Sequence, residues 1–141
     1  NAVSSQRIYL RALGQMLTVE AFEDVLSARR EKWSRSLAVG CQNIMRELGV
    51  LGEVHPMRGS KALLAFVAED KCQGKEEDHL VEVFEGWVRH PTKGHPEALK
   101  LWFDSPISRE VRLGAQRAHN YIEQTLEMKA KAEDEVKKKA R

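Results

Sequence analysis

Two consecutive stretches decide the expected fold: WSRSLAVGCQNIMREL at residues 33–48 and GVLGEVHPMRGSKALLAFVA at residues 49–68. In the first stretch, apolar residues recur every three or four positions and share an arc of about 140° on a helical wheel. These residues are Trp33, Leu37, Ala38, Cys41, Ile44, Met45 and Leu48. Gly49 stands where a left-handed C-cap is expected, so the pattern predicts a helix over residues 33–48. Gly40 weakens this helix and suggests a close crossing with another helix.

The hydrophobic period changes after Gly49. Residues 50–55 predict a short strand, residues 56–60 carry the proline and glycine chemistry of a turn, and residues 61–68 predict a second strand. Because alanine and leucine are good helix formers, a helix over residues 61–68 is the alternative. The preferred interpretation is a β-hairpin.

Two helices are predicted before residue 33, over residues 4–17 and 18–27, with Thr18 as the N-cap of the second. Three helices followed by a hairpin resemble a winged-helix unit, whose third helix enters the major groove of DNA and whose wing touches the backbone. The resemblance covers residues 4–68 and is one of architecture. One unbroken helix over residues 18–48 would abolish it, and the composition of residues 28–34 suits that alternative too.

The polar side of the predicted third helix supplies candidate base contacts. Arg35, Gln42 and Arg46 lie within about 40° of each other, opposite the apolar arc, and Val39 lies beside them. Arginine reads guanine, glutamine reads adenine, and an apolar side chain meets the thymine methyl group. Phosphate contacts are predicted at Arg29, Arg30, Lys32, Arg58 and Lys61. Most surface helices also carry a polar face with some arginine, so the pattern does not by itself distinguish a DNA-reading helix.

A polar run over residues 69–78 is the best internal boundary. It divides a winged-helix-like unit at residues 1–70 from a helical region at residues 71–141. The fold class predicted for the whole chain is therefore mainly α. In the second region we expect helices over residues 76–89, from Pro96 to about Phe103, and from Ile107 onward, with a frayed charged end from about residue 129.

The helical region also carries a candidate protein interface. Trp87, Trp102 and Phe103 are aromatic anchors in otherwise charged helices, which is typical of interface centres. A thin coiled-coil-like seam follows, formed by Val111, Ala115, Ala118 and Ile122. These residues predict a homodimer or a protein partner bound through residues 76–128.

Charge and composition narrow the class of protein. The 141 residues include 23 Lys and Arg against 21 Asp and Glu, a net charge of +2. This balance excludes a histone-like binder of polyanions, so any nucleic-acid contact has to come from local patches. Hydrophobic residues make up 42%, which is enough for a core. No stretch reaches the roughly 18–20 apolar residues of a membrane span.

Two cysteines, Cys41 and Cys72, are too few for a disulfide framework. Cys41 falls on the apolar face of the predicted helix at residues 33–48, where a buried free thiol is expected. We therefore expect an intracellular compartment, without distinguishing cytoplasm from nucleus. The sequence begins with Asn1 rather than Met, which suggests a piece of a longer chain.

Catalytic and metal-binding motifs are missing from the sequence. The candidate zinc ligands are Cys72, His79, His90 and His95, but they lack the tight ligand pairs of structural zinc sites. Cys72 lies in an acidic segment that disfavours a thiolate, and no nucleophile elbow or phosphate-binding loop is present. The sequence predicts no enzyme, no metal and no cofactor.

Two functions are therefore expected. The first is a DNA-binding protein or domain that binds double-stranded DNA, with the helix at residues 33–48 in the major groove and the wing at residues 50–68 on the backbone. The alternative is a helical interaction or oligomerisation module with no nucleic-acid role. An RNA-binding piece of a larger assembly is a third hypothesis.

Overall fold

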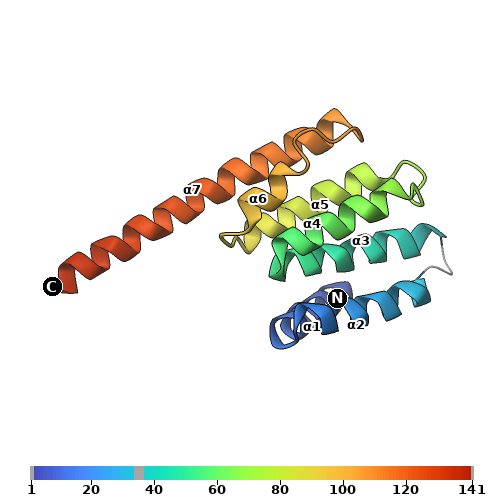
Figure 1. The fold of residues 1–141 in the computed structure, drawn as a ribbon, viewed down its shortest axis with the longest axis horizontal. Helices are drawn as coiled ribbons and strands as arrows, with labels where there is room; N and C mark the ends of the chain where they lie inside the picture. Colours follow the sequence, from blue (N-terminus) through green and yellow to red (C-terminus); the bar gives the residue numbers. More distant parts are fainter. Residues whose placement is uncertain (1, 34–36, 141) are drawn as a thin grey trace.

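The computed structural model describes residues 2–33 and 37–140, and the side chains of residues 6–33 and 40–140. Every regular element in these ranges is a helix (Figure 1). In chain order the helices are α1 (Ala2–Met16), α2 (Val19–Trp33), α3 (Leu37–Val54), α4 (Pro56–Ala68), α5 (Glu76–Arg89), α6 (His95–Lys100) and α7 (Arg109–Ala140). The described chain is all-α.

The β-hairpin predicted after Gly49 is wrong, because both expected strands are helical. Residues 50–54 continue α3 and residues 61–68 belong to α4. Four consecutive residues from Val50 to Glu53 are buried, whereas a strand in a two-stranded hairpin would alternate between a buried and an exposed side. A helix that is packed on several sides loses its amphipathic period. Without a wing, the described chain is not a winged-helix unit.

The connection between α3 and α4 lies at His55–Pro56 rather than at Gly49. Proline cannot continue α3, but it fits the first turn of α4, where its missing N–H would have had no helical partner. The buried residues of α4 recur at helical spacing and are Gly59, Ser60, Leu63 and Phe66. Their burial places α4 alongside α3 (Figure 1).

α2 is longer than predicted and ends at Trp33. Thr18 caps it as expected, since its Oγ1 accepts a hydrogen bond of 3.2 Å from the Ala21 N–H. A Cβ at Gly40 would overlap the carbonyl oxygen of Trp33, so this glycine allows the end of α2 and the start of α3 to lie close together. α2 and α3 pack side by side as separate helices, so a single helix over residues 18–48 does not form (Figure 1).

α3 is the central helix, with α1, α2, α4 and α5 packed around it (Figure 1). A small apolar cluster between α1, α2 and α3 comprises Leu10, Phe22, Leu26, Val50 and Leu51. The larger cluster draws on α3 to α7 and includes Met45, Leu63, Phe66, Leu80, Phe84, Trp87, Leu99, Trp102, Val111 and Ile122. The larger core therefore takes residues from both sides of the boundary expected near residue 70.

The cysteines differ from the sequence expectation. Cys41 of α3 and Cys72 of the loop between α4 and α5 form a disulfide, with their Cα atoms 5.6 Å apart. Cys41 is therefore buried as expected, but it is not a free thiol. The loop turns back at Asp70, Gln73 and Gly74, which all have positive φ. This turn brings Cys72 to α3, a contact that a separation of 31 residues does not reveal.

α5 has the bounds predicted from the sequence. α7 begins at Arg109, two residues after the predicted start at Ile107, and continues through Gly114 as predicted. α5 and α6 both pack against α7. α7 is helical to Ala140 and so includes the charged segment from about residue 129, for which fraying stays a prediction. With 32 residues its length is about 48 Å at 1.5 Å per residue. Its C-terminal part extends away from the other helices (Figure 1).

His95 connects the start of α6 to α3 through a hydrogen bond. Its side chain is fully buried, and its Nδ1 accepts a hydrogen bond of 2.9 Å from the Thr92 N–H. Nε2 must then carry the proton, which it donates to the Gly52 carbonyl oxygen at 3.0 Å. Burial lowers the pKa of the imidazole from its ordinary value of 6.5, because the charged form is poorly solvated there. The fold therefore requires a neutral His95.

We expect the protein to lose stability as the pH falls below about 6.5, because the unfolded chain then binds a proton at His95 that the folded chain resists. His95→Leu should remove most of this pH dependence and cost about 1–3 kcal/mol at neutral pH, since two buried hydrogen bonds lose a partner. Burial and Arg11 also lower the pKa of His90, which accounts for a residual slope. Urea titrations at several pH values measure both effects. An unchanged pH slope in the variant would contradict this role for His95.

Candidate functional site

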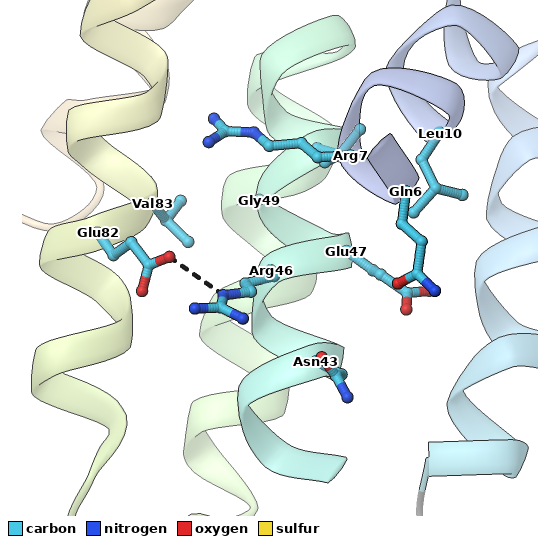
Figure 2. Close-up of a pocket in the computed structure, with 10 residues that line it drawn as sticks. Gln6, Arg7, Leu10, Asn43, Arg46, Glu47, Gly49, Glu82 and Val83 are labelled. Atoms are coloured by element: carbon cyan, nitrogen blue, oxygen red, sulfur yellow. Dashed lines mark hydrogen bonds and ion pairs between the residues drawn. The ribbon is translucent and has the colours of Figure 1, made fainter. Parts of the chain in front are cut away.

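Two of the four predicted base-contact residues, Gln42 and Arg46, have described side chains, and both are half-buried. Arg35 lies outside the described residues, as does the side chain of Val39. Gln42 is half-buried, and Arg46 donates from Nε to Glu82 Oε1 of α5 at 3.1 Å (Figure 2). Arg46 therefore faces α5.

Four of the five predicted phosphate contacts have partners inside the protein. Arg29 Nε donates to Glu47 Oε1 at 2.7 Å, and Trp33 Nε1 donates to Glu47 Oε2 at 2.6 Å. Arg30 pairs with Glu69 at 2.5 Å, and Arg58 pairs with Glu23 at 2.6 Å. The Lys32 ammonium lies 5.3 Å from the centroid of the Trp33 ring. The fifth residue, Lys61, is exposed. These contacts join α2 to α3 and α4, which explains the arginines structurally.

The central position of α3 weakens the DNA-binding hypothesis. A recognition helix needs a free face that enters the major groove, which is about 12 Å wide. α3 is instead surrounded by four helices of its own chain. The element on which the DNA-binding hypothesis rested is thus part of the interior of the bundle.

A groove of about 350 Å³ lies beside α3, between α1 and α5 (Figure 2). Its lining residues are Gln6, Arg7, Leu10, Asn43, Arg46, Glu47, Gly49, Val50, Glu82 and Val83. Arg7 pairs with the buried Glu53, Arg46 pairs with Glu82, and Glu47 holds Arg29 and Trp33. Because these charged groups already neutralise one another, the groove presents no unpaired charge from them to a ligand.

The three aromatic residues predicted to meet a partner pack against the chain itself. Trp87 and Trp102 are fully buried, and their indole N–H groups donate to Gly49 O at 2.9 Å and Ser60 Oγ at 2.8 Å. Phe103 is half-buried and lies 5.1 Å from the His119 ring, edge to face. These side chains belong to the internal core of the molecule.

The predicted seam on α7 is buried in the same way. Val111, Ala115, Ala118 and Ile122 line the side of α7 that packs against α5 and α6. Their small size lets α7 approach closely, and their partner surface is supplied by the same chain. In this conformation they are not available to a second molecule.

The distal part of α7 has a different surface. All residues from 127 to 140 are exposed. An apolar stripe runs along this part and the turns before it, and we define it as Tyr121, Thr125, Met128, Ala132 and Val136. Tyr121, Met128 and Val136 are 57%, 70% and 66% exposed. The stripe keeps within an arc of about 80° at 100° per residue, so it forms one continuous face.

Sequence reasoning missed this stripe because it followed the seam from Val111, which turns toward the body. The signal was nevertheless present as an 11-residue spacing, from Tyr121 to Ala132 and from Thr125 to Val136. Such a spacing keeps apolar residues on one side of a nearly straight helix. Because charged residues lie between the apolar ones, the C-terminal segment was interpreted as uniformly polar.

No protein-family model, curated protein or solved structure matches this chain. Across residues 2–33 and 37–140, no helix is both long and apolar enough to cross a membrane. Within the same ranges, no group of three or more His, Cys, Asp or Glu side chains is arranged to hold a metal ion.

Proposed function

We propose that this chain is a helical oligomerisation module, in which α1 to α6 and the first half of α7 form a body that holds the distal half of α7 ready for association. The observation that carries the proposal is the exposed apolar stripe on a helix that leaves the body. A Met and a Val, each about two-thirds exposed, lie on a segment that contacts no other helix.

The stability of the distal helix supports the same function. Helices shorter than about 12–15 residues are marginal in water, and most helical stability in proteins comes from packing of an apolar face. Residues 127–140 have good helix formers but no tertiary packing within the chain. A second helix laid on the stripe would supply that packing.

The test compares the full chain with a chain that ends at Leu126, the last residue of α7 that packs against the core. We expect light scattering to give the full chain a mass above the 16.1 kDa of one copy at micromolar concentrations, and the shortened chain a monomer mass. Because all residues from 127 to 140 are exposed, the two chains should have similar melting temperatures. A full chain that stays monomeric at all accessible concentrations would contradict the proposed function.

A matched control uses the other exposed apolar residues. Ile8 and Tyr9 on α1 are 71% and 65% exposed, which is similar to Met128 and Val136. Ile8→Ser/Tyr9→Ser should leave the mass of the full chain unchanged, whereas Met128→Ser/Val136→Ser should reduce it to that of one copy. Loss of association in the α1 variant instead would move the interface to α1.

A further inference from the structure

We infer that the partner of α7 is a second copy of this chain in antiparallel orientation, with Ala132 of one copy facing Ala132 of the other. This inference rests on the proposed function and specifies its partner, orientation and register. Its basis is a charge and size pattern on the exposed end of α7 that is symmetric about Ala132.

The apolar residues have this symmetry. Met128 and Val136 lie four residues before and after Ala132, and about 40° to either side of it on the helical wheel. In an antiparallel pair centred on Ala132, Met128 of each copy meets Val136 of the other. The small Ala132 side chains at the centre let the two helices approach closely there.

The charges flanking the stripe have the same symmetry with opposite signs. On one flank, Lys129 lies about 60° and Glu133 about 100° from Ala132 on the helical wheel. On the other flank, Glu135 lies about 60° and Lys131 about 100° from Ala132. In the antiparallel pair each flank meets its own counterpart, so Lys129 lies beside Glu133 of the second copy and Lys131 beside Glu135. The offset along the helix axis is about 3 Å in each case, which suits an ion pair. Four such pairs form in the dimer.

A parallel, in-register pair has the opposite electrostatics. There each flank meets the other flank, so Lys129 lies beside Lys131 of the second copy and Glu133 lies beside Glu135. Like charges at these distances repel, and the repulsion selects against this orientation. All four residues are exposed, so the pairing strength should weaken with salt. The charge order along α7 therefore favours the antiparallel dimer.

The register also fits the shape of the molecule. It lays residues 124–140 of one copy along residues 124–140 of the other, which are the turns of α7 beyond the last fully buried residue, Ile122. The two bodies then lie at opposite ends of the paired helices and do not compete for the same space. The buried seam of α7 stays packed within each copy.

Cysteine cross-linking tests the orientation. In the antiparallel register, Met128→Cys should form an intermolecular disulfide only when mixed with Val136→Cys, because two copies of residue 128 are about 12 Å apart along the axis. A tag of different length on each chain distinguishes the mixed product on a non-reducing gel. The unchanged chain is the control, because Cys41 and Cys72 are buried and paired. Cross-linking of Met128→Cys with itself would overturn the antiparallel assignment.

Charge reversal tests the pairing. Glu133→Lys/Glu135→Lys and Lys129→Glu/Lys131→Glu should each weaken the dimer at least tenfold, and combining all four changes should restore it. The control, Glu123→Lys/Asp134→Lys, makes the same change in net charge as Glu133→Lys/Glu135→Lys but on the opposite side of α7, and it should have little effect.

The two proposals fail in different ways. A dimer that is lost in the chain ending at Leu126 but is indifferent to the reversals would overturn this register and leave the oligomerisation function intact. A monomeric full chain would overturn both.

Discussion

Replacing Gly59 with alanine should destabilise the protein by about 3 kcal/mol or more, toward the upper end of overpacking effects. Gly59 lies where α4 crosses α3, and a Cβ there would overlap the backbone of Gly52. Backbone atoms cannot turn aside as a flexible side chain can, so the helices would have to move apart. Chemical denaturation monitored by circular dichroism measures the free energy of unfolding.

Gly114→Ala is the matched control for this substitution. Gly114 is also helical, but a Cβ there would meet Val81 at an ordinary 3.7 Å. Alanine has a higher helix propensity than glycine, so this variant should gain up to about 1 kcal/mol. Equal effects at Gly59 and Gly114 would show that the crossing of α3 and α4 is not closely packed.

Trp87→Ala is expected to cost about 3–5 kcal/mol, as for other large-to-alanine changes in a core. Trp87 is fully buried between α3, Phe84 and His95, with its ring centroid 5.7 and 5.4 Å from theirs. The substitution opens a cavity and removes the donor to the Gly49 carbonyl oxygen. Thermal unfolding followed by calorimetry gives the loss directly.

Tyr121→Ala provides the aromatic control, because Tyr121 is 57% exposed. Its removal should change the stability of the monomer by no more than about 0.5 kcal/mol, the usual range for surface positions. The measurement is best made at a concentration where association is negligible. If Trp87→Ala were as mild as Tyr121→Ala, the buried position of Trp87 would be contradicted.

The sequence was most informative where local chemistry decides the structure. α5 begins with three acidic residues and ends before Pro91, so both of its bounds were predicted correctly. Prolines likewise identified the connectors on either side of α6, and Thr18 identified the start of α2. Caps and prolines act through the residues next to them, and a single sequence contains those neighbours.

The sequence rules for glycine failed along α3 and α4, because glycines in these helices are needed where residues distant in the sequence pack closely against them. Gly49 was interpreted as a helix end, yet it lies within α3 against Val83, where a Cβ would approach to 2.9 Å. Gly59 was interpreted as part of a turn, yet it permits a helix crossing. A local rule reads glycine as a breaker, and only the packed structure reveals that a neighbouring helix needs the space.

The candidate site posed a similar difficulty. Arg29 and Glu47 are 18 positions apart, and Arg7 and Glu53 are 46 positions apart, so the sequence shows unpaired arginines where the fold has ion pairs. An arginine on a polar helix face therefore resembled a ligand-binding group. The stripe on α7 was accessible from spacing alone, and its significance emerged once the first half of α7 was known to pack inward.

The central position of α3 also has a consequence for the order in which parts of the molecule unfold. α1 and α2 contact the rest of the chain through the small cluster around Phe22, a few ion pairs and Trp33 at the end of α2, and most of the larger core lies outside this helical pair. Because four helices pack around α3, we expect its amides to be among the slowest to exchange with solvent. Local opening is thus confined to the two ends of the chain, where the N-terminal pair can separate without disturbing the α7 surface.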